Sequence, residues 1–195
     1  MSWFRRLLQY ATNPEASMSH SRSGQSQRAI PTVKFDPASV SQSVKANLRA
    51  NVESLDDVGK KHIRPVYEAA LGCVLAGGDL HLLSVALMKI EGVPKERAAE
   101  IARSLHSKAN AQIDRERQAS LGITHAKWMC SNAPCMKDPG RRMVADVQQD
   151  SAHRLANGKR YEISKGLFVD GKWTWPGVEE GCKCSSRAIL PGLKE

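Results

Sequence analysis

The sequence predicts an α+β protein with a helical N-terminal half and a small, loop-rich, strand-containing Cys/His module at its C-terminus. Apolar residues recur at helical spacing up to residue 120, whereas glycine, proline and short apolar segments follow Gly122. Four of the five cysteines lie between residues 130 and 184. We therefore divide the chain into three parts: residues 1–35, 36–120 and 121–195.

Residues 1–35 are predicted to be a flexible tether with a short amphipathic start. Residues 11–34 are rich in Ser, Gln, Asn and Arg, so they offer little apolar surface to offset the entropy lost on ordering. The amphipathic start carries Trp3, Phe4, Leu7 and Leu8. It lacks the long apolar region and cleavage site of a secretory signal, and no segment approaches the ~20 apolar residues of a membrane span. We expect synthesis in the cytosol and no membrane partner.

Residues 36–120 are predicted to form four helices. An apolar residue at every fourth position follows Asp36-Pro37, which supplies an N-cap and a first-turn proline. Glycines mark the ends of the later helices. The first helix is expected to begin at Asp36-Pro37, and the second to run from about His62 to Ala76. The third follows a cap at Asp79 and ends before Gly92, and the fourth runs from Pro94 to about Ser120.

Residues 121–195 are predicted to contain short strands. Asp170-Gly171 is a strong hairpin signal, because both residues adopt the positive φ angles of a tight turn. The expected strands are Arg160–Ile163, Leu167–Val169 and Lys172–Trp175. Three tryptophans, Trp128, Trp173 and Trp175, are expected to cover the small core of this module.

The cysteines of the module suggest a metal site. They form two close pairs, Cys130-x4-Cys135 and Cys182-x-Cys184, with His153 between them. Thiolate and imidazole ligands suit a tetrahedral zinc ion. These five residues exceed the four ligands of such an ion, and the Cys-x-Cys spacing is tighter than usual. Disulfides between the two pairs remain the competing interpretation, although clustered cysteines in the cytosol more often bind metal.

A catalytic role has weaker support in the sequence. A hydrolytic zinc site needs an open coordination position and a nearby general acid or base. Asp146, Asp150 and Glu179 are available but follow no known motif. A Cys–His nucleophile pair would need a contact that the sequence does not establish. We therefore expect no enzyme.

The net charge of +9 favours polyanionic surroundings such as nucleic acid, or an anionic protein surface. The cationic residues are spread along the chain rather than gathered in a basic tail. The apolar spacing of Leu80–Ile90 and Pro94–Leu105 would also fit a helix-turn-helix. That spacing is weak support, because any packed helix pair joined at a glycine shows it.

A set of landmarks follows in a fixed order along the second half of the chain. They are Arg97 to Ser104, Ala109-Asn110, Leu121-Gly122-Ile123, Trp128, Cys130 and Cys135, Asp150-x-x-His153, Asn157-Gly158-Lys159 and Gly181-Cys182-Lys183-Cys184. In this order they resemble the phage head morphogenesis family, the Mu F-like minor head proteins. The resemblance covers roughly Pro94 to Leu193, about half of the chain. The first pair of cysteines is spaced more widely than in the family, Lys183 replaces the usual Arg, and an insertion around Met136–Gln149 precedes His153.

The resemblance implies a minor structural protein of a tailed-phage virion, acting in head assembly or DNA delivery. Its expected partners are the portal or major capsid protein, and packaged DNA bound without sequence preference. Its expected location is the head or portal region, after synthesis in the host cytoplasm. The alternatives are an injected or head-resident enzyme, such as a nuclease or transferase, and a zinc-dependent DNA-binding protein.

Overall fold

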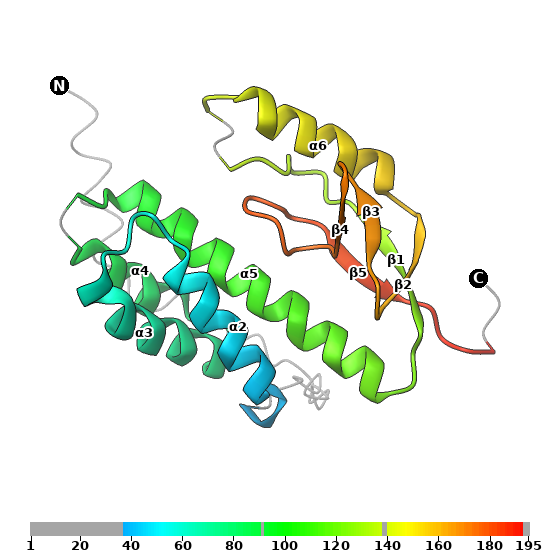
Figure 1. The fold of residues 1–195 in the computed structure, drawn as a ribbon, viewed down its shortest axis with the longest axis horizontal. Helices are drawn as coiled ribbons and strands as arrows, with labels where there is room; N and C mark the ends of the chain where they lie inside the picture. Colours follow the sequence, from blue (N-terminus) through cyan, green and yellow to red (C-terminus); the bar gives the residue numbers. More distant parts are fainter. Residues whose placement is uncertain (1–36, 91, 138–139, 193–195) are drawn as a thin grey trace, which may run out of the picture. The chain divides into compact units, whose positions relative to one another are not determined.

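The computed structural model describes residues 37–90, 92–137 and 140–192. The predicted tether and its amphipathic start lie outside the described residues. Within them the fold is α+β, with helices in the first half and short strands and a Cys/His cluster in the second (Figure 1). None of the described helices combines the length and apolar composition needed to cross a membrane.

Four α-helices and two 3-10 turns form the first half. Their inward-facing aliphatic side chains build one core, to which Val44, Leu48, Leu87, Ile101 and Leu105 contribute fully buried side chains. The elements are η1 (Pro37–Ser39), α2 (Gln42–Glu53), η2 (Lys60–His62), α3 (Ile63–Leu75), α4 (Leu80–Met88) and α5 (Lys95–Ser120).

The first α-helix starts later than predicted. Pro37 opens a single 3-10 turn, and α2 begins only at Gln42. The cap is Ser41, whose extended backbone lets its side-chain oxygen accept a hydrogen bond of 3.1 Å from the backbone N–H of Val44. Val40 is nevertheless buried, so the predicted apolar stripe is correct although its first residue precedes the helix.

Glycines end α3 and α5 as the sequence predicts. After α5, Gly122 has a φ of 71° and its N–H bonds the carbonyl of Ala119, while the N–H of Ile123 bonds the carbonyl of Gln118. This Schellman pattern needs a residue that accepts positive φ. Gly77 and Gly78 form the same pattern after α3.

The second half contains a three-stranded antiparallel sheet in the order β2-β1-β5, and a separate β3–β4 hairpin. Asp170 and Gly171 join the hairpin with φ angles of 51° and 77°, as a tight turn requires. The elements are β1 (His125–Met129), α6 (Val144–Ala156), β2 (Arg160–Glu162), β3 (Leu167–Val169), β4 (Lys172–Thr174) and β5 (Ser185–Ala188).

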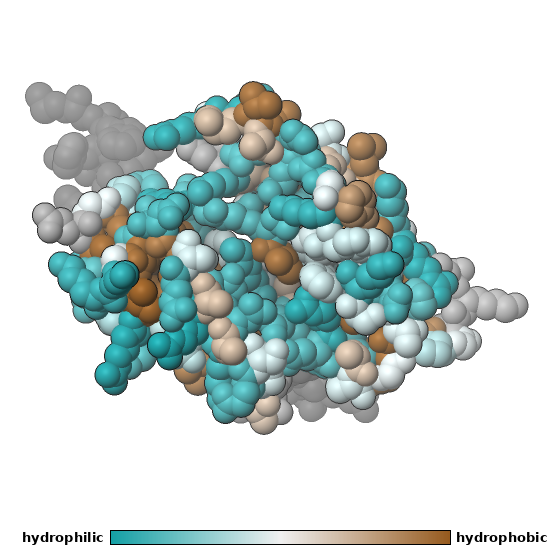
Figure 2. Space-filling model, viewed as in Figure 1, coloured by the Kyte–Doolittle hydropathy of each residue, from teal (hydrophilic) through white to brown (hydrophobic). Residues whose placement is uncertain are grey.

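Helix α6 and strands β1 and β5 are absent from the sequence prediction. The buried face of α6 is formed by Asp150, His153 and Ala156 and therefore lacks an apolar stripe. Its outer side instead exposes Val144, and Figure 2 shows an apolar patch over the first turns of this helix. The large apolar residues of α6, Val144, Val147 and Leu155, lie on its exposed side, so apolar periodicity does not mark the face that the fold buries.

The module has its own core, and one tryptophan differs from its predicted place. Trp128 on β1 is fully buried, and Trp175 is partly buried against the same core. Trp173 is 51% exposed, because the pleat of β4 directs its side chain away from the core, where it packs edge-on against Phe168. The prediction that Trp173 covers the core is wrong.

Helix α5 lies between the two cores and contacts both. Along the module it contacts β5, where the hydroxyl of Ser186 donates a hydrogen bond of 3.3 Å to Gln118. The guanidinium of Arg115 lies 4.3 Å from the ring centroid of Trp175, a cation–π arrangement. The helix therefore carries packing on two sides.

Candidate metal centre

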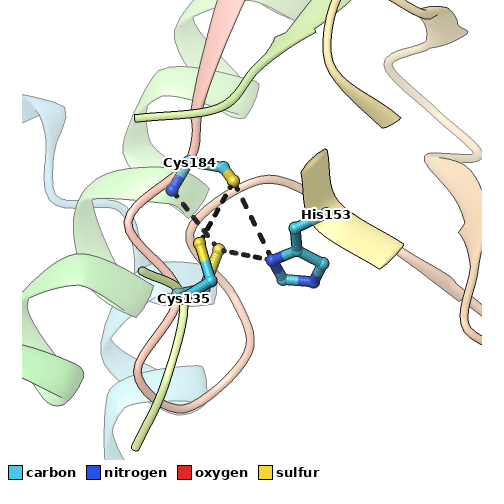
Figure 3. A group of neighbouring side chains, drawn as sticks. Cys135, His153 and Cys184 are labelled. Carbon is cyan, nitrogen blue, oxygen red and sulfur yellow. Dashed lines mark hydrogen bonds between the residues drawn. The ribbon is translucent and has the colours of Figure 1, made fainter. Parts of the chain in front are cut away.

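Four candidate ligands from three separate segments meet inside the module. Cys135 lies in the loop after β1, His153 lies on α6, and Cys182 and Cys184 lie between β4 and β5. All four are buried, and their donor atoms lie within 4.8 Å of one another. In Figure 3 the imidazole nitrogen and the sulfurs point toward a common centre. This group could hold a metal ion.

Three of the separations between donor atoms match a tetrahedral ion, and all of them lie within 4.8 Å. The sulfurs of Cys135 and Cys184 are 3.5 Å apart, and Nδ1 of His153 lies 3.4 Å from the sulfur of Cys182 and 3.8 Å from that of Cys184. Bonds of about 2.3 Å to sulfur and 2.0–2.1 Å to nitrogen would place tetrahedral donors about 3.5–3.8 Å apart. Little rearrangement is needed for the four side chains to bind one ion.

Backbone amides donate hydrogen bonds to the sulfurs of Cys135 and Cys182. The N–H of Lys183 donates to the sulfur of Cys135 at 3.3 Å. The sulfur of Cys182 accepts from the N–H groups of Gly177 at 3.3 Å and Cys184 at 3.4 Å. Hydrogen bonds to a charged acceptor stabilise that charge. Since the thiolate is the form that binds metal, these amides support ligation.

Helix α6 holds both ligand-bearing loops. The carboxylate of Asp150 accepts a 2.8 Å hydrogen bond from the N–H of Cys135 and a 2.8 Å hydrogen bond from Arg154. The side-chain amide of Gln149 donates to the carbonyls of Cys135, at 3.0 Å, and Glu180, at 2.9 Å. Two neighbouring residues of α6 thus fix the backbone of Cys135 and of Glu180, which lies just before Cys182. His153 follows on the same helix.

The electrostatics of the cluster favour a thiolate beside an imidazolium when no metal is bound. Hydrogen bonds from Cys182 and Cys184 hold the pKa of Cys135 far below its usual value. Burial would lower the pKa of His153, but its hydrogen bonds to Cys135 and Cys182 outweigh that effect and raise it to about 9. Hydrogen bonds with Cys135 and Cys182 raise the pKa of Cys184, so that thiol keeps its proton. Without metal the site therefore holds a neutral thiolate–imidazolium pair, and a bound ion would displace the protons of His153 and Cys184.

Trp128 packs against the histidine of the cluster. Its ring centroid lies 5.2 Å from that of His153 with an interplanar angle of 65°, an edge-to-face contact. Trp128 is fully buried, so it separates the imidazole from solvent on this side. The contact explains why the tryptophan of β1 belongs to the site as well as to the core.

The fifth predicted ligand, Cys130, lies outside the four-donor cluster. Its thiol contacts the carbonyl of Ser131 at 3.5 Å, and its N–H donates to the side chain of Asn157 at 2.9 Å. Burial raises the pKa of Cys130. All five cysteines are free, and the 3.5 Å between the sulfurs of Cys135 and Cys184 exceeds the roughly 2.05 Å of a disulfide.

Two of the three carboxylates considered for catalysis, Glu179 and Asp150, hold structural hydrogen bonds. Glu179 accepts hydrogen bonds from Lys172 at 2.7 Å and Thr174 at 2.8 Å, and Asp150 is held as described above. The sequence analysis missed Gln149 and the helix that carries it, because neither shows in the apolar pattern. The spacing Asp150-x-x-His153, which places both side chains on one helical face, was the available signal.

Comparisons with protein-family models, curated proteins and solved structures find no match to this chain.

Proposed function

We propose that this chain is a non-enzymatic structural protein of a tailed-phage particle. We further propose that one zinc ion, held by Cys135, His153, Cys182 and Cys184, stabilises its C-terminal module. The observation that carries the zinc proposal is the buried group of four donors at tetrahedral spacing. The phage proposal has its support in the order of sequence landmarks shared with Mu F-like minor head proteins.

The donor set favours a structural ion over a catalytic one. A structural zinc site uses four protein ligands, whereas a catalytic site keeps one position for water or substrate. Three thiolates and one imidazole would fill a tetrahedral ion.

A metal suits the size of this module. The strands of its sheet have only three to five residues each, and the ligand loops on either side have no regular structure. Such a small core supplies limited stability. Because the donors lie on three segments, one ion would join them and contribute binding free energy directly to folding.

The zinc proposal is tested by metal analysis of the full chain purified under reducing conditions. We expect about one zinc per chain, and we expect Cys184→Ser or His153→Ala to abolish tight binding and to lower the Tm. The matched control is Cys130→Ser, which removes a neighbouring thiol outside the cluster and should retain the zinc. Iron in place of zinc, no metal, or equal loss in the Cys130 variant would each overturn the assignment.

The particle proposal needs a separate test. Purified virions of the phage that encodes this chain should contain the protein in few copies, detected by quantitative mass spectrometry. We expect the protein to associate with the portal or major capsid protein. Deletion of its gene should therefore reduce the yield of infectious particles. The proposal fails if purified virions lack the chain or if particles without it form and infect normally.

A further inference from the structure

Three cationic residues stand directly opposite one another across the three strands of the sheet. The register pairs Lys127 of β1 with Arg160 of β2 on one side and with Arg187 of β5 on the other. Paired residues in an antiparallel sheet project to the same face. The three side chains therefore form one row, here named the cationic row, perpendicular to the strands.

The cationic row lies on the outer face of the sheet. The alternate residues of β1, Ala126 and Trp128, are fully buried, and their partner Tyr161 on β2 is buried as well. The row occupies the opposite face, where Arg160 and Arg187 are exposed and Lys127 is partly exposed. Within the described residues, neither Arg160 nor Arg187 forms an ion pair with a carboxylate.

Taken alone, this register of like charges is unfavourable for the folded protein. Like charges directly opposite each other on neighbouring strands repel, whereas opposite charges would attract. Here the central strand has a cation on both sides. A sheet with an anionic partner on this face would instead gain from all three charges.

We propose that the outer face of the β2-β1-β5 sheet binds the phosphate backbone of duplex DNA through the cationic row. This inference goes beyond the proposed function, since it assigns a partner to a specific face and needs neither the zinc nor the phage proposal. It rests on the register and charge of Arg160, Lys127 and Arg187. The contacts are to phosphates, so binding is independent of sequence.

The dimensions of the row fit one DNA strand. Neighbouring strands lie about 4.8 Å apart, so the row spans about 10 Å. Phosphates follow one another every 3.4 Å along the axis of a DNA strand, and about three of them match this length. Arginine and lysine are long and bear charge at their tips, which lets each reach one phosphate.

The chemistry of the face favours nucleic acid over a protein partner. The other paired positions on it are His125 with Glu162 and Met129 with Ser185. Protein interfaces usually bury a central apolar or aromatic group. Met129 is the one large apolar residue among these paired positions and lies at the end of β1, whereas the centre of the face is cationic and the whole chain has a net charge of +9.

The test measures binding of a fluorescent 20-base-pair duplex to the full chain by anisotropy at several salt concentrations. Arg160→Glu combined with Arg187→Glu should weaken binding at least about tenfold at low salt. It should also reduce the slope of log affinity against log salt by about 1.8, since each lost phosphate contact removes about 0.9.

The matched control is Lys60→Glu combined with Lys61→Glu, which changes the net charge equally at exposed positions in the helical half. We expect the control to bind nearly as tightly as the wild type. Equal loss in both variants, or no loss in the sheet variant, would overturn the proposal. Polyglutamate that binds this face more tightly than DNA would also overturn it, in favour of an acidic protein.

Folding is checked with neutral variants. Arg160→Gln combined with Arg187→Gln removes the repulsion without introducing acid, so its Tm should equal or exceed that of the wild type while DNA affinity is lost. Retention of affinity in this folded variant would contradict the proposed contact.

Discussion

At the scale of single residues, Gly181 carries the tightest constraint near the candidate metal centre. Its φ of 74° lies in the left-handed region, and a Cβ atom at this position would overlap the backbone carbonyl of Met136. Met136 follows Cys135 and Gly181 precedes Cys182, so this contact is where the two ligand loops meet. Only glycine permits the two backbones to approach so closely.

We expect Gly181→Ala to destabilise the protein by about 2–4 kcal/mol, from the strain of positive φ and from the overlap with Met136. It should also lower zinc affinity, because the loops must separate. Gly158→Ala is the matched control: its φ is 76°, but no atom lies within 4 Å of a Cβ there. Gly158→Ala should cost only the backbone strain, about 1–2 kcal/mol. Urea unfolding measures both, and equal losses would show that the overlap is relieved elsewhere.

Residue types predicted the candidate ligands but not which of them come together. Cys130 and Cys135 have the same chemistry, and only the path of the loop between them brings one sulfur to His153 and leaves the other beside Ser131. Trp173 shows the same limit. Its type suggests a core, whereas its place on β4 directs it to solvent.

At the scale of elements, the helices with apolar stripes and glycine ends were predictable, and so was the Asp170-Gly171 hairpin. These elements depend on local sequence, since periodicity and positive φ are properties of neighbouring residues. Helix α6 depends on contacts with the two ligand loops, and its buried side is polar. Strand β5 has the sequence Ser-Ser-Arg-Ala and is defined by its pairing with β1.

The charge repulsion across β1 and β5 gives a prediction about the sheet. We expect Arg187→Glu to raise the free energy of unfolding by about 0.2–1 kcal/mol. In the variant a carboxylate faces Lys127, where the wild type has the guanidinium of Arg187. The gain should shrink at high salt, since the charges are at the surface. Thermal unfolding at two salt concentrations measures the effect.

Ser185→Glu is the control for this substitution. It adds the same acidic residue to β5, but Ser185 faces Met129, so no opposed cation is present. We expect little change in Tm. If Arg187→Glu lowers the Tm, the cationic row would be stabilised by contacts that its register does not show. If the Arg187→Glu variant is more stable and also binds DNA less tightly, the same charges that destabilise the sheet would be the ones that bind DNA.

At the scale of the whole molecule, Arg97 links the helical half to the ligand loops. It lies in the first turn of α5 and donates hydrogen bonds of 3.1 and 2.7 Å to Asp57, which precedes η2. The same guanidinium donates at 3.3 Å to Glu180, whose carbonyl is held by Gln149. The arginine side chain is only 21% exposed, so solvent screens these contacts incompletely.

We expect Arg97→Met to lower the free energy of unfolding at pH 7 by about 1–2 kcal/mol, because Asp57 loses its hydrogen-bonded cation, whereas Glu180 keeps its ion pair with Lys137. The hydrogen bond from Arg97 holds the pKa of Asp57 below its usual value of 3.8. A depressed pKa stabilises the folded state above the unfolded pKa, and this contribution is lost as pH falls through the lower, folded value. The difference between wild type and variant should therefore shrink below about pH 4.

Urea unfolding of both proteins from pH 7 to pH 3 measures this difference. Arg49→Met is the control, since its ion pair with Glu53 is exposed on α2 and joins no second element; it should change stability little at any pH. A constant difference for Arg97→Met at all pH values would mean that packing of its side chain, rather than its charge, joins the two halves. A difference that disappears in acid would assign the link to the ion pair with Asp57, because a protonated Asp57 no longer needs the guanidinium.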